Sequence, residues 1–383
     1  MTLLMNNKDQ RLMWVDALKG IAIFFVVLGH SPYLSQLPQK VFNVIFSFHM
    51  PLFLFIAGYL FNPDVTGKEM IKKRFKSLLK PYIFTVTIII LVYFIFRQDH
   101  SLGWYLFWAL YGNGPNLPKL ALHLWFLPHL FLVTLFVWFF YHYFSILKKS
   151  LIAQLLMMII LFISGFLVIG LFWDIAIPTS ITNIFISNGN QFMLNGLLDN
   201  TAYSKTQLID AKEFILKGLP WSLDVVLISA AFFISGYFIK KNDFEKLFHK
   251  HSIALLTLLL FASLHFFYNY TIDLNLRRYD NFFICTFLAL AGIYICTYLA
   301  LTFANTNNIL AHTLQHIGRY SLIVYIFHLI IQSKVYFAIL AILPNKAGIA
   351  FLPALAAGIG LPILLNCFLL KRFKFFRFWY YSR

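Results

Sequence analysis

The sequence predicts an all-α, polytopic membrane protein with about ten transmembrane helices and both termini in the cytoplasm. Of its 383 residues, 60% are hydrophobic and only 12% are charged, about half the charged share of an average soluble protein. The mean hydropathy is +0.76. Since no hydrophilic stretch is long enough for a second domain, we expect one membrane domain over residues 1–383.

Ten apolar runs have the length of a membrane-spanning helix, about 17 to 25 residues. An even number of spans places both termini on the same side of the membrane. The runs lie at about 14–31, 42–61, 81–97, 122–145, 151–172, 221–239, 252–270, 281–303, 321–343 and 349–370.

The basic residues indicate the orientation. With the N-terminus in the cytoplasm, about two thirds of the 31 Lys and Arg residues fall on inner loops and termini, as the positive-inside rule requires. The net charge of +17 is therefore concentrated at span ends, which argues against nucleic-acid binding. The segment after Lys8 and Arg11 has no small-residue cleavage site, so we expect a retained first span. We expect a multi-pass protein of a bacterial inner membrane.

Two regions on the outer side are long, at about 98–121 and 173–220. The first favours an interfacial helix around Trp104–Tyr111, and the second a short helix near 191–199. Either region would shape an acceptor site or simply cap the helix bundle, and both interpretations stay open.

The first span carries three ionisable residues, Asp16, Lys19 and His30. At about 100° per residue all three share one stripe of the helix, with Lys19 and His30 about 16 Å apart along its axis. Ionisable groups at membrane depth usually face protein or a water-filled cavity. The alternative is that Asp16 and Lys19 mark one membrane surface and His30 the other.

The second span returns after a short hairpin and carries His49. A short hairpin makes the two spans antiparallel neighbours, so His30 and His49 are expected to approach one level. Pro51 lacks an amide hydrogen and is expected to kink the helix one turn upstream. The alternative is that both histidines are packing residues.

Several short motifs follow one another along the chain. They are Asp16-x-x-Lys19-Gly20 with His30; Phe48-His49-Met50-Pro51-Leu52-Phe53 with Gly58-Tyr59; Leu124-Trp125-Phe126-Leu127-Pro128; Leu219-Pro220-Trp221-Ser222-Leu223-Asp224 with Gly236-Tyr237; and Gly318-Arg319-Tyr320-Ser321-Leu322 with His328. In this order they resemble acyltransferase family 3, and most of all its fucose 4-O-acetylase-like members. The resemblance covers about residues 11–372.

The resemblance implies a membrane enzyme that moves an acyl group, usually acetyl, from a coenzyme A thioester to a hydroxyl, often on a cell-surface glycan or its sugar precursor. It implies His30 as the catalytic residue, and Lys19 at a position where many members have Arg. Members also tend to carry paired arginines before the third span. Here the run is Lys72-Lys73-Arg74-Phe75-Lys76-Ser77, and lysine grips phosphate less firmly than arginine does.

These residues suggest roles in acyl transfer. A base must take the proton of the attacking hydroxyl, and a histidine suits that task at neutral pH. We predict His30 as this base, with His49 as orienter or oxyanion donor and Asp16 as the third catalytic residue. The phosphates of acetyl-CoA, or of another acyl-CoA, are predicted to be held by Lys19, Lys73, Arg74 and Lys76. The alternative is that these cations only set the topology.

Three further residues are candidates for acceptor binding: Trp125, Asp224 and His328. Asp224 opens the sixth span and has an equally good interpretation as a helix cap. His123, His129 and His265, like His328, are more often packing residues than catalytic ones. The group Arg277, Arg278 and Asp280 would contact an acceptor or lipid phosphate, or solvate a turn.

The sequence contains no motif for a metal site, a nucleotide-binding loop or a serine nucleophile. Cys285, Cys296 and Cys367 have no metal or disulfide spacing, and we expect buried thiols and no metal site. There is no P-loop and no Gly-x-Ser-x-Gly elbow. The rival interpretations are a transporter or flippase that relays protons through its intramembrane His and Asp, and a non-catalytic scaffold. The expected partners are acyl-CoA, a glycan or sugar acceptor and the lipid bilayer.

Overall fold

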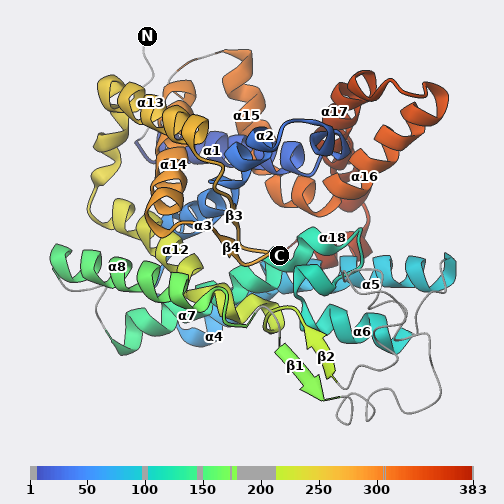
Figure 1. Ribbon diagram of the computed structural model, residues 1–383, viewed down its shortest axis with the longest axis horizontal. Helices are drawn as coiled ribbons and strands as arrows, with labels where there is room; N and C mark the ends of the chain where they lie inside the picture. The colour runs from blue at the N-terminus through green and yellow to red at the C-terminus, as the bar shows by residue number, and fades with distance from the viewer. Residues whose placement is uncertain are drawn as a thin grey trace.

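The computed structural model describes residues 7–96, 102–144, 150–172, 175–178, 213–304, 306 and 308–381. It is almost entirely helical (Figure 1). The α-helices are α1 (Asn7–Gly29), α2 (Gln39–Phe46), α3 (His49–Tyr59), α4 (Gly67–Arg74), α5 (Lys80–Phe96), α6 (Leu102–Tyr111), α7 (Phe126–Tyr143), α8 (Leu151–Val168), α12 (Val226–Lys241), α13 (His251–Phe267), α14 (Phe282–Ala304), α15 (Ile309–Arg319), α16 (Ser321–Ile342), α17 (Ala347–Leu365) and α18 (Lys374–Tyr380).

Shorter elements connect them. The 3-10 turns are η1 (Pro32–Gln36), η3 (Gly114–Asn116), η4 (Leu122–Trp125), η6 (Pro220–Val225) and η7 (Phe244–His249), and the π-helical turns are η2 (Phe75–Leu79) and η8 (Asn366–Leu370). Two small antiparallel pairs, β1 (Ile175–Pro178) with β2 (Glu213–Leu216) and β3 (Ile272–Asp273) with β4 (Arg278–Tyr279), are the strands of the described residues.

In the described part of the chain, eight helical stretches are long and apolar enough to cross a membrane. They coincide with eight of the ten predicted spans. The first and seventh predicted spans are occupied by α1 and α13, which are 23 and 17 residues long. The all-α, multi-pass membrane class is therefore confirmed.

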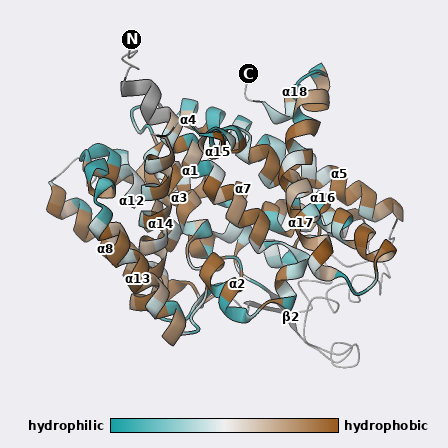
Figure 2. Ribbon diagram, turned by 90° about the horizontal axis from the view of Figure 1, so that it is seen from above, coloured by the Kyte–Doolittle hydropathy of each residue, from teal (hydrophilic) through white to brown (hydrophobic). Residues whose placement is uncertain are grey.

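Basic residues gather at one end of the bundle. Figure 2 shows α4, α15 and α18 at one end of the molecule and α2 at the opposite end. The last turns of these three helices carry basic residues, among them Lys73, Arg319 and Arg377. Such clustering agrees with a cytoplasmic location of this end, and we refer to it as the basic end.

The second predicted span, 42–61, is two helices rather than one kinked helix. α2 ends at Phe46, α3 begins at His49, and Ser47 and Phe48 separate them. Pro51 has no amide hydrogen to donate to the carbonyl of Ser47, four residues earlier. The Ser47 hydroxyl donates to the carbonyl of Val44 (2.8 Å), and His265 Nε2 lies 3.3 Å from the same hydroxyl. The predicted kink is corrected to an interruption between α2 and α3.

The structure also bears on the helices expected in the connecting regions and on the three cysteines. The interfacial helix expected around Trp104–Tyr111 is present as α6. The short helix expected near 191–199 lies outside the described residues. Cys285 and Cys296 are buried as expected, but Cys367 is exposed on the π-helical turn η8. That corrects its assignment to the buried core.

Helix α1 is central to the fold and packs against α3, α14, α15 and α16. Its contact with α15 is close because both helices have glycine there. A Cβ on Gly20 would lie 2.1 Å from the Leu314 carbonyl oxygen, and a Cβ on Gly318 would lie 1.8 Å from the Asp16 carbonyl oxygen. Gly58 of α3 and Gly236 of α12 allow the backbones of these two helices to approach each other in the same way. These motif glycines are therefore required by helix packing.

Substituting Gly318 by Ala is expected to separate α1 from α15 and to destabilise the protein by about 1–3 kcal/mol or more, because the contacted atom is backbone and cannot rotate away. A thermal melt of the detergent-solubilised protein, followed by size-exclusion chromatography, measures this. The control is Gly360→Ala in α17, where a Cβ meets nothing within 4 Å. Equal melting temperatures for the two variants would contradict the close approach.

Candidate active site

His30 directly follows the last residue of α1. Its Nδ1 lies 2.8 Å from the carbonyl oxygen of Val26. A carbonyl only accepts hydrogen bonds, so Nδ1 carries the proton in the neutral ring and Nε2 keeps a free lone pair. His30 is partly exposed. The backbone thus holds this imidazole in the tautomer that presents Nε2 as a base.

Two other imidazoles pack on His30. The ring centroid of His328, in the middle of α16, lies 5.2 Å away, and that of His123, in η4, lies 6.3 Å away. The His123 and His328 centroids are 4.9 Å apart. We call these three residues the histidine cluster. Among the described residues, no group of three or more His, Cys, Asp or Glu side chains is arranged to hold a metal ion.

The tautomers of the other two rings follow from the same rule. His328 Nδ1 donates to the Tyr325 carbonyl oxygen (2.7 Å), and His123 Nε2 donates to that of Ile326 (3.2 Å). Each ring therefore keeps one acceptor nitrogen, and in both cases that nitrogen is buried with no partner in the described structure. Since buried polar atoms are normally paired, these two nitrogens are suited to receive a ligand hydroxyl.

Gln332 adds an unpaired amide one turn further along α16. Its side chain is fully buried, and neither its Nε2 nor its Oε1 has a partner among the described residues. A Cβ on Gly358 would lie 3.1 Å from Gln332 Cβ and 3.0 Å from Val27 Cγ1. Gln332 therefore faces α1 and α17, with Val27 three residues before His30.

His49 is one aromatic ring away from the cluster. The Phe46 ring centroid lies 6.5 Å from that of His30 and 4.6 Å from that of His49. His49 is buried, and its Nδ1 donates to the Ile45 carbonyl oxygen (2.9 Å). The hairpin brings both histidines to Phe46, but the imidazoles that contact His30 are His123 and His328.

Asp16 belongs to the basic end rather than to the histidine cluster. Its carboxylate lies 3.3 Å from Lys19 Nζ and 3.5 Å from Arg319 Nε. Fourteen residues of helix separate it from His30, about 21 Å along the axis. We therefore group Asp16 with Lys19 and Arg319 at the basic end.

Lys73, Arg74 and Lys76 lie where α4 passes into the π-helical turn η2. Arg74 Nε is buried and has no hydrogen-bond partner in the described structure. The helices α4 and α15 share the basic end (Figure 2). π-helical turns are frequent at functional sites, and the unpaired Nε–H of the half-buried Arg74 is suited to an anion.

Asp224 is held in a buried ion pair. Arg277 Nε lies 2.7 Å from its Oδ2 and Arg277 Nη2 lies 2.9 Å from its Oδ1, with both side chains almost inaccessible. The Oδ1 atom also accepts from the amide of Leu219 (3.0 Å). Both carboxylate oxygens are thus occupied within the protein, which favours a structural role over acceptor binding.

The segment around this pair has an unusual backbone. Trp221, Ser222 and Arg277 adopt left-handed φ angles of 53°, 56° and 54°, a conformation that is costly for residues other than glycine. Burial raises the pKa of Tyr111 to about 12, so its hydroxyl stays protonated and donates to the Gly218 carbonyl oxygen (2.6 Å). The ion pair and these bonds hold the strained turn in place.

Trp125 is a packing residue in this structure. It is 4% exposed, and its ring centroid lies 5.3 Å from that of His129. His129 in turn contacts Ser229 Oγ at 2.8 Å. His123, which lies two residues before Trp125 and was expected to be a packing residue, is the side chain of this region that contacts His30 and His328.

A family model described as an acyltransferase domain, that of acyltransferase family 3, matches residues 12–371. The chain belongs to acyltransferase family 3. The match covers α1 and α16, so the histidine cluster lies within the family domain.

Two relatives of this acyltransferase family 3 chain are the nodulation proteins NolL. That of Mesorhizobium japonicum is 33% identical over 102 residues, which cover 22% of this chain and 24% of the relative. That of Sinorhizobium fredii is 35% identical over 97 residues, covering 22% and 25%. The chain thus spans about a quarter of the length of these curated relatives. No solved structure matches.

Proposed function

We propose that this acyltransferase moves an acetyl or other short acyl group from acyl-CoA to a hydroxyl of a cell-surface glycan or its sugar precursor, in a bacterial inner membrane. The observation that carries the proposal is the fixed tautomer of His30, whose free Nε2 stands beside two further imidazoles with unpaired acceptor nitrogens.

In the proposed reaction His30 Nε2 accepts the proton of the acceptor hydroxyl as its oxygen attacks the thioester carbonyl carbon. A new C–O bond forms and the C–S bond breaks. The leaving thiolate takes the proton from the His30 imidazolium, which returns the ring to its starting form. No redox step and no covalent enzyme intermediate is required.

His123 and His328 position the acceptor in this scheme. Their unpaired nitrogens accept hydrogen bonds from hydroxyl groups, which suits a sugar with several hydroxyls. The Gln332 amide offers N–H donors one turn away, and donors directed at a developing oxyanion are a large source of rate enhancement. His49, across Phe46, remains a proposed orienter of the site.

The acyl-CoA is proposed to enter from the basic end. Lys19 and Arg319 flank Asp16 there, and Lys73, Arg74 and Lys76 approach from α4 and η2. The axial distance from Lys19 to His30 is about 16 Å, which an extended pantetheine arm is suited to span. The phosphates would then stay among the cations while the thioester reaches the histidine cluster.

Thioester turnover tests the proposal. The full chain is reconstituted in nanodiscs with acetyl-CoA, and free thiol is measured with and without candidate sugar acceptors, followed by mass spectrometry of the acceptor. We expect thiol release to depend on the acceptor and one acetyl group to be added per thiol. Movement of an unmodified glycan across liposomes without thiol release would support a transporter instead.

Replacing Gln332 by Leu separates a catalytic from a structural role. We expect acetyl transfer to fall by about 10²–10³-fold if the amide stabilises the oxyanion. We expect the melting temperature to be unchanged or raised, because the variant removes two unpaired buried polar atoms. Steady-state kinetics and a thermal melt measure the two effects.

Gln154→Leu is the matched control, because Gln154 is also buried but its Oε1 accepts from Asn242 Nδ2 (3.3 Å). That variant is expected to lose stability and keep its turnover. Full activity in Gln332→Leu would remove the amide from the mechanism.

A further inference from the structure

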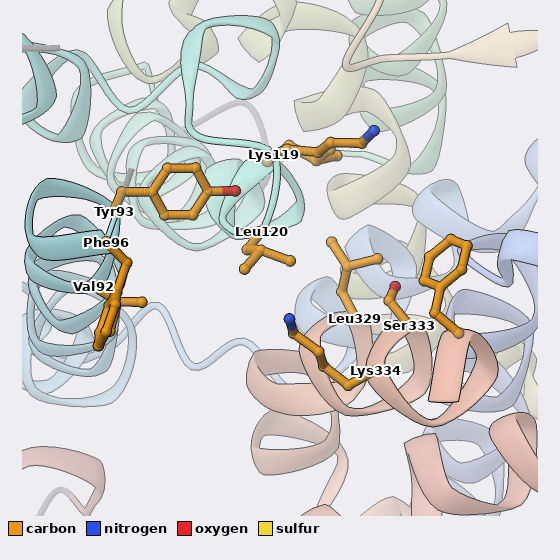
Figure 3. A pocket seen from close by; sticks show the side chains of 10 residues that line it. Val92, Tyr93, Phe96, Lys119, Leu120, Leu329, Ser333 and Lys334 are labelled. Atoms are coloured by element: carbon orange, nitrogen blue, oxygen red, sulfur yellow. The ribbon is translucent and has the colours of Figure 1, made fainter. Parts of the chain in front are cut away.

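A pocket of about 590 Å³ opens between α5 and α16. Figure 3 shows Tyr93 and Phe96 of α5 on one side and Leu329, Ser333 and Lys334 of α16 on the other. Apart from two lysines, the lining is mainly apolar. The volume lies in the range of small-molecule sites, about 300–1,000 Å³.

The pocket adjoins the histidine cluster through the chain itself. Leu122 and Leu329 line it, and they are the sequence neighbours of His123 and His328. Two separate elements, η4 and α16, therefore each carry a lining residue of the pocket and, beside it in sequence, a histidine of the cluster. A molecule held in the pocket would lie against the same two elements that carry His123 and His328.

The lining carries two cations and no acid. Lys119 and Lys334 are exposed, and neither ammonium group forms a hydrogen bond or ion pair within the described residues. Lys334 lies inside the membrane-spanning helix α16 (Ser321–Ile342), where an ionisable residue is costly and usually functional. In Figure 3 its side chain extends toward the space between the two walls. The complementary ligand group is an anion.

The rim of the pocket is suited to a hydrocarbon chain. Phe96 is 80% exposed and Phe337 is 59% exposed, and both stand on membrane-spanning helices. Large apolar side chains exposed on such helices face lipid. A hydrocarbon chain in the bilayer therefore has a lateral, apolar path to the ammonium groups of the two lysines. A water-soluble ligand would not need such a path.

We propose that this pocket binds the acceptor, and that the acceptor is a sugar joined through a phosphate to a lipid chain. The inference rests on the proposed function and specifies its acceptor class. The phosphate lies between Lys119 and Lys334, the lipid chain leaves between Phe96 and Phe337, and the sugar extends past Leu122 and Leu329 to the histidine cluster.

Binding is tested apart from catalysis with three matched probes: farnesyl phosphate, farnesol and methyl phosphate. Native mass spectrometry of the full chain in nanodiscs measures the bound fraction of each. We expect farnesyl phosphate to bind at least tenfold more tightly than either of the others. Lys334→Gln and Lys119→Gln should each weaken it about tenfold, as loss of a charge-assisted contact does. Lys346→Gln, an exposed lysine between α16 and α17, is the control and should not weaken it.

A second variant, Ser333→Phe, fills the pocket and should prevent binding of farnesyl phosphate without changing the two lysines. His30→Ala should bind it normally, so a failure of the proposed chemistry is distinguishable from a failure of this site. Equal binding of farnesol, with no effect of the lysine variants, would show an ordinary lipid-facing groove and overturn the proposal. Equal binding of methyl phosphate would assign the site to soluble phosphates and also overturn it.

Discussion

Substituting His30 by Ala is expected to abolish acetyl transfer while the protein stays folded in the membrane. Removing a general base typically costs about 10²–10⁴-fold in rate, and here the base also contacts both other cluster imidazoles. Thiol release from acetyl-CoA in the presence of acceptor measures the loss. Since His30 is only partly buried and bonds a carbonyl of its own helix, the thermal melt should change little.

His249→Ala is the matched control for this experiment, because His249 is exposed in η7 and lies outside the cluster. It should keep full turnover. If His30→Ala retained more than about a tenth of the wild-type rate, the base would have to be another group, and His328 would be tested next.

Substituting Asp224 by Ala is expected to cause a large loss of stability. It leaves the Arg277 guanidinium buried without its carboxylate, and breaking a buried pair in this way costs about 3–5 kcal/mol. The strained turn at Trp221 and Ser222 would lose its anchor at the same time. The expected result is a much lower melting temperature and a low yield of monodisperse protein.

The neighbouring pair Arg278–Asp280 provides the control. Its geometry is similar, at 2.9 Å, but the Arg278 side chain is 54% exposed, and exposed pairs contribute about 0–1 kcal/mol. Asp280→Asn should therefore melt near the wild type. The double variant Asp224→Ala with Arg277→Met should recover part of the loss, and no recovery would show that the ion pair is not the cause.

The helices were predictable because a membrane span is encoded by a continuous local run of apolar residues. A run of about twenty apolar residues is sufficient, and each predicted run coincides with helix in the part of the chain that the structure describes. Interruptions within a span were harder to predict from the sequence. Pro51 indicated a kink, but whether the chain bends or breaks at Ser47 depends on neighbours such as His265, whose Nε2 lies 3.3 Å from the Ser47 hydroxyl.

The site was only partly predictable. His30 was identified from its position on the first helix, and the hairpin led to His49. His123 and His328 come from distant parts of the chain, so their contact with His30 depends on how η4 and α16 are placed beside the end of α1, which helical periodicity does not encode. The ion pair of Asp224 was not predictable for the same reason, because its partner Arg277 lies on another loop. A signal for Gln332 existed in its spacing of four residues from His328.

The exposed aromatic rim formed by Phe96 and Phe337 has a consequence for kinetics. A substrate that arrives through the bilayer is supplied by two-dimensional diffusion, so its effective concentration is a mole fraction of the lipid and not an amount per volume of buffer. Adding inert phospholipid at a constant amount of acceptor should then slow turnover, whereas diluting the suspension into buffer with the same acyl-CoA concentration should leave the rate per enzyme unchanged. In the cell, the proposed turnover would follow the mole fraction of that substrate in the membrane.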